Sequence, residues 1–353
     1  VPERHAGGLR RRRAQAAGKL KRGHLEAGAV TPEQLQQLRQ GLPALADKIP
    51  PSPLLQAFCQ FYHIDYSAYA GLEHRAGTVP SGDFSLMVHQ WTQPAATRNL
   101  LVVHGYFDHT GLFGKLVDYG LSRNCNVLCF DLPGHGLSSG EPAVIDDFRH
   151  YSRAIADVLY AADWPDLPPW TIAQSTGCAA LMDFARHYPW PFSHTVLLAP
   201  LVRPAGWHRI RVGNQLLRPF VDSIARSFNE NSSDREFLAA IEKDPLQARR
   251  VSMRWVGALR AWLAELPGED LGVGPALILQ GDEDGTVDWR YNVPFVSRLF
   301  PASHVEYLPG AGHQLANESA KIRDKYMQTI DRYLGLAPLS EGAPAAMGCA
   351  DDS

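Results

Sequence analysis

The chain of 353 residues lacks several features that would assign it to other protein classes. No apolar run approaches the roughly 20 residues that span a bilayer, so we expect no transmembrane helix. The N-terminal segment lacks the apolar core of a secretory signal, so no signal peptide is predicted. No phosphate-binding loop and no dinucleotide glycine fingerprint is present, and we expect no cofactor. These absences favour a globular protein of the cytoplasm.

Cysteine is scarce, and its spacing suits neither a disulfide framework nor a metal site. The five residues are odd in number and form no pair with metal-ligand spacing: Cys59, Cys125, Cys129, Cys178 and Cys349. Reduced, buried thiols are therefore favoured over disulfides, and no metal site is predicted.

Charge of one sign gathers at the start of the chain. Residues 1–24 hold eight Lys and Arg against one acid, Glu3, so this arm carries +7 and leaves −10 for the rest of a chain whose net charge is −3. Such an arm is either a solvated leader or a contact for anionic lipid or nucleic acid. We predict no nucleic-acid partner, keep peripheral contact with an anionic membrane open, and find no indication of an oligomeric state.

Punctuating residues divide the chain. Thr31-Pro32-Glu33-Gln34 has the pattern of a helix start with a capping box, and Pro50-Pro51-Ser52-Pro53 interrupts the chain. We expect an N-terminal basic arm and helical appendage over 1–53. The main domain then occupies 54–200 and 271–336, an insertion occupies 201–270, and a disordered tail rich in Ala, Pro and Gly occupies 337–353.

Short apolar runs alternate with helical patterns through the main domain. We predict strands at 72–78, 84–91, 99–104, 125–130, 170–173, 195–199, 276–280 and 304–308, with helices near 111–122, 145–163, 177–187 and 316–334. Most of these strands lack polar alternation and are followed by helices. This pattern predicts a mostly parallel, doubly wound α/β sheet covered on both faces.

The insertion after the sixth strand contains no strand candidate and reads as helical. Apolar residues recur at spacings of three and four in two stripes, one formed by Leu217, Val221, Ile224 and Phe228 and the other by Trp255, Leu259, Trp262 and Leu263. Packing against the sheet domain is the favoured interpretation. A lid that lines an apolar tunnel or touches a membrane is the alternative.

Ser175 lies in Thr171-Ile172-Ala173-Gln174-Ser175-Thr176-Gly177, between an apolar run and a helical pattern. A serine between small residues at such a junction is typical of a tight strand-to-helix turn that presents the hydroxyl to substrate. We predict that Ser175 is a catalytic nucleophile.

A serine nucleophile needs a base and an orienting acid, and both candidates follow predicted strands. His313, in a loop with Gly310 and Gly312, is the predicted base, since its ordinary pKa suits proton transfer. Asp284 is the predicted acid among four in its loop; Asp282 and Glu283 are expected to be turn or surface residues.

An oxyanion site needs two backbone N–H groups. One is predicted at Thr176, at the start of a helix, and the other at Tyr106, after the turn that Gly105 permits. We also expect Gly105, Tyr106, Phe107 and Gln174 to contact the substrate.

Five motifs in register resemble the α/β-hydrolase fold, and most closely the monoacylglycerol lipase and lysophospholipase group, also termed serine aminopeptidase-like hydrolases. They are His104–Gly111, Phe130–Ser138, Ser175, Asp284 and His313, in the chain order Ser, Asp, His; the similarity extends over 62–334. Asp244-Pro245-Leu246 in the insertion also resembles that group's cap. Ala173 replaces the usual glycine before the nucleophile, and Asp108 stands where the group often has Glu.

The resemblance implies a helical cap inserted after the sixth strand of an α/β-hydrolase fold. It also implies that His104, His109 and His135 shape loops around the site and bind no zinc. The implied activity is hydrolysis of a small-molecule ester or lipid through an acyl-enzyme, with monoacylglycerol or lysophospholipid-like substrates expected. A thioesterase, a short-chain carboxylesterase and an aminopeptidase-like amidase remain alternatives with the same triad. A non-catalytic binding protein is disfavoured because all three triad residues are present.

Overall fold

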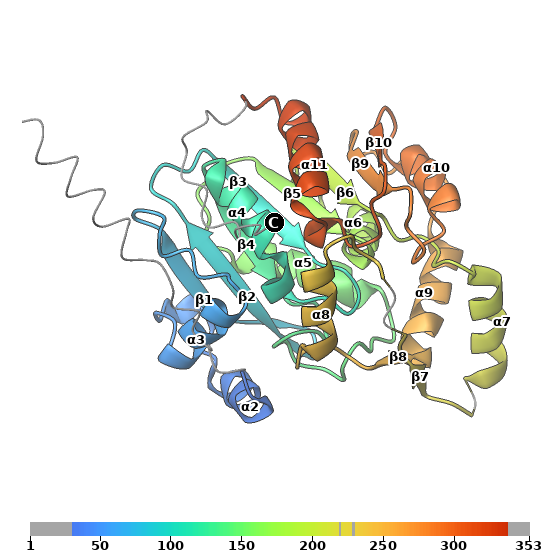
Figure 1. Ribbon diagram of the computed structural model, residues 1–353, viewed down its shortest axis with the longest axis horizontal. Coiled ribbons are helices and arrows are strands. Elements are labelled where there is room, and N and C mark those ends of the chain that lie inside the picture. The colour runs from blue at the N-terminus through green and yellow to red at the C-terminus, as the bar shows by residue number, and fades with distance from the viewer. Residues whose placement is uncertain (1–29, 219, 228–229, 338–353) are drawn as a thin grey trace, which may run out of the picture.

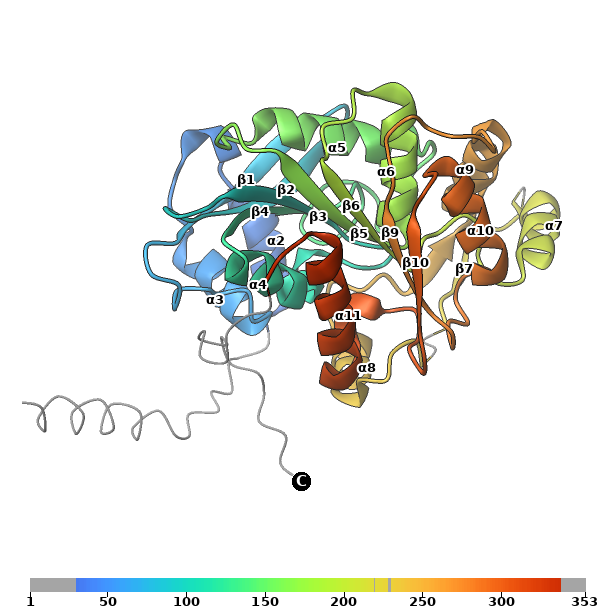
Figure 2. The ribbon, with the colours of Figure 1, turned by 90° about the horizontal axis from the view of Figure 1, so that it is seen from above.

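The computed structural model describes residues 30–218, 220–227 and 230–337. Its centre is an eight-stranded sheet with the strand order β1-β2-β4-β3-β5-β6-β9-β10 (Figures 1 and 2). The strands are β1 (Glu73–Ser81), β2 (Phe84–Thr92), β3 (Arg98–Val103), β4 (Cys125–Phe130), β5 (Pro169–Gln174), β6 (His194–Leu198), β9 (Leu277–Gly281) and β10 (His304–Leu308).

Strand direction confirms the predicted sheet. β1 pairs with β2 and β2 with β4 in antiparallel fashion, whereas every pairing from β4 across to β10 is parallel. The carboxyl ends of the parallel strands therefore meet at one edge, where the loops after β3, β5, β9 and β10 come together.

Helices cover both faces of this sheet, as its apolar strands require. In Figure 2, α5 (Arg149–Ala161) and α6 (Thr176–His187) lie on one face, and α3 (Pro53–Phe61), α4 (Gly114–Ser122) and α11 (Ala320–Tyr333) on the other. Each layer has its own apolar cluster, with α10 (Trp289–Leu299) contributing to the first. Among the described residues, no helix is both long and apolar enough to cross a bilayer.

The N-terminal segment packs on the sheet domain. The capping box predicted at Thr31 is present at the start of α2 (Pro32–Gly41), with the Gln34 N–H donating to Thr31 Oγ1 and the Thr31 N–H to Gln34 Oε1. Leu35 and Leu38 are buried, and the Pro43 carbonyl accepts a hydrogen bond from the Thr78 N–H in β1 at 2.8 Å. The basic arm, 1–24, and nearly all of the predicted tail, 338–353, lie outside the described residues.

The insertion between β6 and β9 is confirmed, but it is not wholly helical. It holds α7 (Trp207–Leu217), α8 (Arg235–Lys243) and α9 (Met253–Glu265), and also a small antiparallel pair, β7 (Ser223–Ala225) with β8 (Arg250–Ser252). The prediction that it contains no strand was wrong, because strands of three residues are too short to show alternation.

The first predicted apolar stripe was also wrong, while the second is confirmed as core. α7 ends at Leu217, so the stripe does not continue along one helix, and Ile224 lies in β7. Phe228 lies outside the described residues. In α9, by contrast, Trp255, Leu259 and Trp262 are buried against the sheet domain.

Candidate active site

Ser175 occupies the predicted strand-to-helix turn. β5 ends at Gln174, α6 begins at Thr176, and the serine between them has φ +51° and ψ −112°. A non-glycine residue rarely adopts such a backbone, at a cost on the order of 1–3 kcal/mol. A Cβ on Gly177 would lie 2.5 Å from the Val103 carbonyl oxygen, which explains the small residue two positions after the serine.

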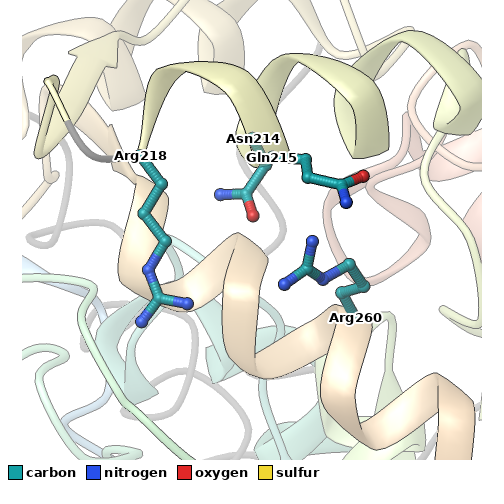
Figure 3. A pocket seen from close by; sticks show the side chains of 4 residues that line it. All are labelled: Asn214, Gln215, Arg218 and Arg260. Atoms are coloured by element: carbon teal, nitrogen blue, oxygen red, sulfur yellow. The ribbon is translucent and has the colours of Figure 1, made fainter.

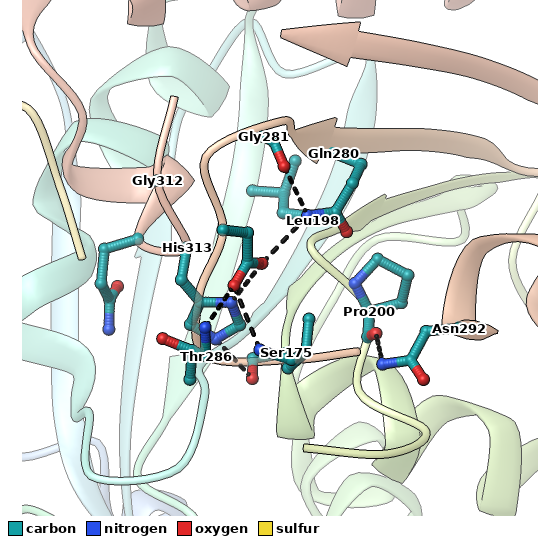
Figure 4. Close-up of polar contacts among 12 residues, drawn as sticks. Ser175, Leu198, Pro200, Gln280, Gly281, Thr286, Asn292, Gly312 and His313 are labelled. Atoms are coloured by element: carbon teal, nitrogen blue, oxygen red, sulfur yellow. Dashed lines mark hydrogen bonds and ion pairs between the residues drawn. The ribbon is translucent and has the colours of Figure 1, made fainter. Parts of the chain in front are cut away.

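Three side chains from three loops form a continuous hydrogen-bonded chain at this turn (Figure 4). His313 Nε2 lies 2.9 Å from Ser175 Oγ, and His313 Nδ1 lies 2.8 Å from Asp284 Oδ2. Because an ionised carboxylate only accepts hydrogen bonds, the imidazole donates from Nδ1, and its Nε2 is left to accept the serine proton. All three residues are buried.

The loop after β9 holds Asp284 in a fixed orientation. Its Oδ2 also accepts a hydrogen bond from Gln280 Nε2 at 2.9 Å, and its Oδ1 accepts from the backbone N–H groups of Thr286 and Val287. Asp282 and Glu283 are exposed, and Asp282 accepts from the Gly310 N–H. Of these three acids, Asp284 therefore reaches the histidine, and Gln280 is a supporting residue that sequence reasoning missed.

The pair of charges shifts both titrations. Burial by itself would raise the pKa of Asp284, but the charge of His313 and the hydrogen bonds from His313 and Gln280 hold it below its usual 3.8. Burial would likewise lower the pKa of His313, yet the nearby Asp284 carboxylate raises it above 6.5. The arrangement stabilises an imidazolium, which is what a base that takes up a serine proton requires.

The loop after β3 lies directly against the serine. A Cβ on Gly105 would lie 2.8 Å from Asp108 Oδ2 and 3.3 Å from Ser175 Cβ, so glycine lets this loop approach the serine without displacing either residue. Within the described part of the chain, the backbone N–H groups of Tyr106 and Thr176 form no hydrogen bond. Both N–H groups therefore stay available as donors. Phe107, which follows Tyr106, has φ +69°.

A chain of buried, hydrogen-bonded side chains supports this loop. From the sequence, Gln314 was given no role, and Gln174 was expected only to contact the substrate. Gln314 Nε2 donates to Asp108 Oδ1 at 2.9 Å, and its Oε1 accepts from Gln174 Nε2 at 2.6 Å. Gln174 Oε1 also accepts from the Ala316 N–H. The Gln174 side chain is fully buried, so a substrate contact through its amide would require these bonds to break. Burial also raises the pKa of Asp108.

The cap is tied to the core beside the site. Asp244, in the cap, accepts a hydrogen bond from His109 Nε2 at 2.9 Å and one from the Tyr62 hydroxyl at 2.8 Å. Against the effect of burial, the two charges lower the pKa of Asp244 and raise that of His109. The Tyr106 ring also stacks on Trp255 of α9, with centroids 3.9 Å apart.

The histidines near the site hold loops in place. His104 Nε2 accepts from the Leu132 N–H, and its Nδ1 donates to the Gly105 carbonyl at 2.7 Å. Away from the site, Cys59, His74 and His89 bring possible ligand atoms within 4.8 Å of one another. The two imidazoles already share a 3.0 Å hydrogen bond, and burial raises the pKa of the thiol to about 12. Three possible ligand atoms are fewer than a structural zinc site uses, so we assign no metal to this cluster.

Comparison with known proteins identifies a family and several relatives. Residues 94–320 match the family described as serine aminopeptidase, S33. The chain is 26% identical to the monoglyceride lipase of Mus musculus over 73% of this chain and 90% of that protein. It is 23% identical to phospholipase YtpA of Bacillus subtilis over 65% of this chain and 92% of that protein. A soluble variant of monoglyceride lipase from Saccharomyces cerevisiae superimposes with a TM-score of 0.63 at 17% identity, covering 74% of this chain and 96% of that one.

Proposed function

The chain belongs to the serine aminopeptidase (S33) family, and from this premise we propose that Ser175 is the nucleophile of a serine ester hydrolase. The enzyme cleaves carboxylic esters. Ser175 Oγ attacks the acyl carbonyl while His313 Nε2 takes its proton, and Asp284 stabilises the imidazolium. His313 then returns the proton to the leaving alcohol. Water, activated by the same histidine, releases the acyl group and regenerates the serine.

The observation that carries the proposal is the unbroken chain from Ser175 Oγ through His313 to Asp284, with both contacts under 3 Å. The N–H groups of Tyr106 and Thr176 would hold the oxyanion, since neither has another partner among the described residues. Gly105, Tyr106 and Phe107 would line the substrate site, and Gln174 would contribute through the backbone before the nucleophile.

The proposed substrates are monoacylglycerols or lysophospholipid-like esters. Relatives named monoglyceride lipase and phospholipase support this class. So does the apolar wall that Trp255 of the cap builds with Tyr106 of the loop after β3. We propose a core over 54–200 and 271–336 and a cap over 201–270 that contributes this wall. A thioesterase, a short-chain carboxylesterase or an amidase would use the same triad, and a panel of esters, acyl-CoA and an aminoacyl amide separates them.

We further propose a cytoplasmic enzyme that contacts anionic membrane through the cap. Val212, Leu216, Phe220 and Ile224 are large apolar side chains exposed on and just after α7. Close to them, Arg218 and Arg260 face a cavity of about 370 Å³ between α7 and α9 (Figure 3). Apolar side chains flanked by cations suit a surface of anionic lipid. Binding to anionic but not neutral liposomes, weakened by Leu216→Ser, would support this contact; equal binding to both would contradict it.

A fluorophosphonate probe tests the nucleophile. Labelling of the wild type and none of Ser175→Ala is expected. The matched control is Ser193→Ala, which removes an exposed serine just before β6 and should still label. Equal labelling of Ser175→Ala and the wild type would reject the proposal.

A further inference from the structure

A second cavity, of about 300 Å³, lies beside the loop that follows β3. Its walls come from the loop 134–142, the cap segment 245–248, Phe107, and Arg39 of helix α2. Phe107 is two residues from Gly105, whose backbone lies against Ser175. The cavity therefore shares Phe107 with the loop that carries the Tyr106 N–H group.

Two buried nitrogen atoms of residues that line this cavity have no hydrogen-bond partner. They are His135 Nε2 and Gln247 Nε2, and each residue is only 5% exposed. Most buried polar groups are paired. Both residues line the cavity although the two nitrogens have almost no exposed surface, so a ligand that enters the cavity pairs with them once their side chains turn toward it.

The chemistry of the two atoms is complementary. His135 Nδ1 lies 2.9 Å from the Pro133 carbonyl and must donate to it, so Nε2 is an acceptor. Burial lowers the pKa of His135 to about 4, which keeps the ring neutral. Gln247 Oε1 accepts from Arg226 Nη1 at 2.6 Å, so its free Nε2 is a donor. A hydroxyl group, which both donates and accepts, would satisfy both residues.

A cation stands at the same cavity. Arg39 is exposed, and its Nη2 donates to the Gly136 carbonyl at 2.7 Å, which directs the guanidinium to this loop. Its other N–H groups have no partner among the described residues. Glu141, the carboxylate of the loop 134–142, is paired with Arg254 at 2.8 Å. A free guanidinium fork suits phosphate.

We propose that this cavity, which we call the head-group cavity (Arg39, Phe107, His135 and Gln247), binds a glycerol phosphate head group. In this proposal a glycerol hydroxyl pairs with His135 Nε2 and Gln247 Nε2 after a shift of their side chains, and the phosphate pairs with Arg39. The inference rests on the proposed function and narrows it to phosphate-bearing lysolipids. Arg39 lies outside residues 94–320, which match the family, so helix α2 adds this contact from the N-terminal segment.

The first experiment compares kcat/KM for 1-oleoylglycerol 3-phosphate and 1-oleoylglycerol, each dilute in neutral detergent micelles. The wild type is expected to prefer the phosphate ester at least about tenfold, and Arg39→Gln to lose about that factor, the range of a hydrogen bond to a charged group. Arg39→Lys keeps the charge and is expected to restore part of the preference. Arg235→Gln, which removes an exposed arginine of α8, controls for net charge and should keep the full preference.

Gln247→Glu provides an independent variant. It retains the oxygen that Arg226 contacts but replaces the free donor with a carboxylate that repels phosphate. The preference is expected to fall further than in Arg39→Gln. An unchanged ratio of the two kcat/KM values in both variants would overturn the inference.

Binding to the full-length chain tests the cavity without turnover. By calorimetry, sn-glycerol 3-phosphate should bind the wild type more tightly than inorganic phosphate or glycerol, and about tenfold more weakly to Arg39→Gln. Equal binding of glycerol 3-phosphate and inorganic phosphate would reject a head-group site. Hydrolysis of nitrophenyl butyrate, which has no head group, reports on the proposed function separately: turnover of this ester with no head-group discrimination sinks the cavity alone.

Discussion

The triad and the head-group cavity differ in how their polar groups are satisfied. Each carboxylate oxygen of Asp284 accepts two hydrogen bonds, and both ring nitrogens of His313 are hydrogen-bonded. In the cavity, His135 and Gln247 each leave a buried nitrogen unpaired. Preorganised groups can act without rearrangement, whereas unpaired ones are completed by a ligand. The difference teaches that chemistry and substrate choice are built into separate parts of one site.

The most severe way to break the triad without touching the cavity is Asp284→Asn. The amide would favour the wrong histidine tautomer, and a loss of about 10⁴-fold in kcat is expected. The preference for phosphate over neutral substrate should survive in the residual activity. Steady-state kinetics on both lysolipids measure this. A loss below tenfold would show that Asp284 does not orient His313.

Removing the tether between cap and core should damage the cavity more than the triad. Asp244→Ala leaves His109 buried without its partner, which costs about 3 kcal/mol of stability. Since the cap segment 245–248 lines the head-group cavity, discrimination between the lysolipids should fall more than turnover of nitrophenyl butyrate. Urea unfolding and kinetics test both parts.

The control for this variant is Asp222→Ala, which removes an exposed carboxylate of the same cap that accepts no hydrogen bond from the described residues. It should unfold like the wild type. If both variants were equally stable, the tether would carry no measurable free energy.

The acidic limb of the pH–rate profile tests the effect of Asp284 on the pKa of His313. The imidazolium of His313 must lose its proton before it can act as a base, and the pKa of His313 is raised by Asp284. The midpoint of kcat/KM should therefore lie above pH 6.5 in the wild type and shift downward in Asp284→Asn. A midpoint that stays in place would contradict the ion pair.

The smallest effect concerns the pH dependence of the tether. Because the pKa of Asp244 is lowered, its contribution to the free energy of unfolding is complete above pH 3.8. This contribution is lost as the pH falls through the pKa of Asp244 in the folded protein. That of His109, whose pKa is raised, is complete below 6.5 and is lost as the pH rises through its folded value. The difference in Tm between wild type and Asp244→Ala should be largest near about pH 5. A difference that grows toward pH 9 would be inconsistent with this pair.

Elements with strong local patterns could be predicted from the sequence. Apolar strands such as 125–130, and the small residues around Ser175, depend on neighbouring positions, and the structure shows them where expected. Helix α10 was missed because Pro294 interrupts its apolar spacing, and β7 and β8 were too short to recognise.

Contacts between distant segments could not be read from local patterns. Gln280, near the end of β9, supports Asp284 in the following loop, but nothing in the sequence distinguishes it from an ordinary polar strand residue. Arg39 and Gly136 are in contact although 97 positions separate them, and Gln247 is distant from both in the sequence. Sequence motifs identified the candidate triad, whereas the head-group cavity depends on tertiary packing.

Trapping the acyl-enzyme tests the central claim most directly. A slowly deacylating ester, followed by proteolysis and mass spectrometry, should leave one acyl group on the peptide that contains Ser175. Ester turnover with no acyl group on that peptide, or with the group on another residue, would contradict the account.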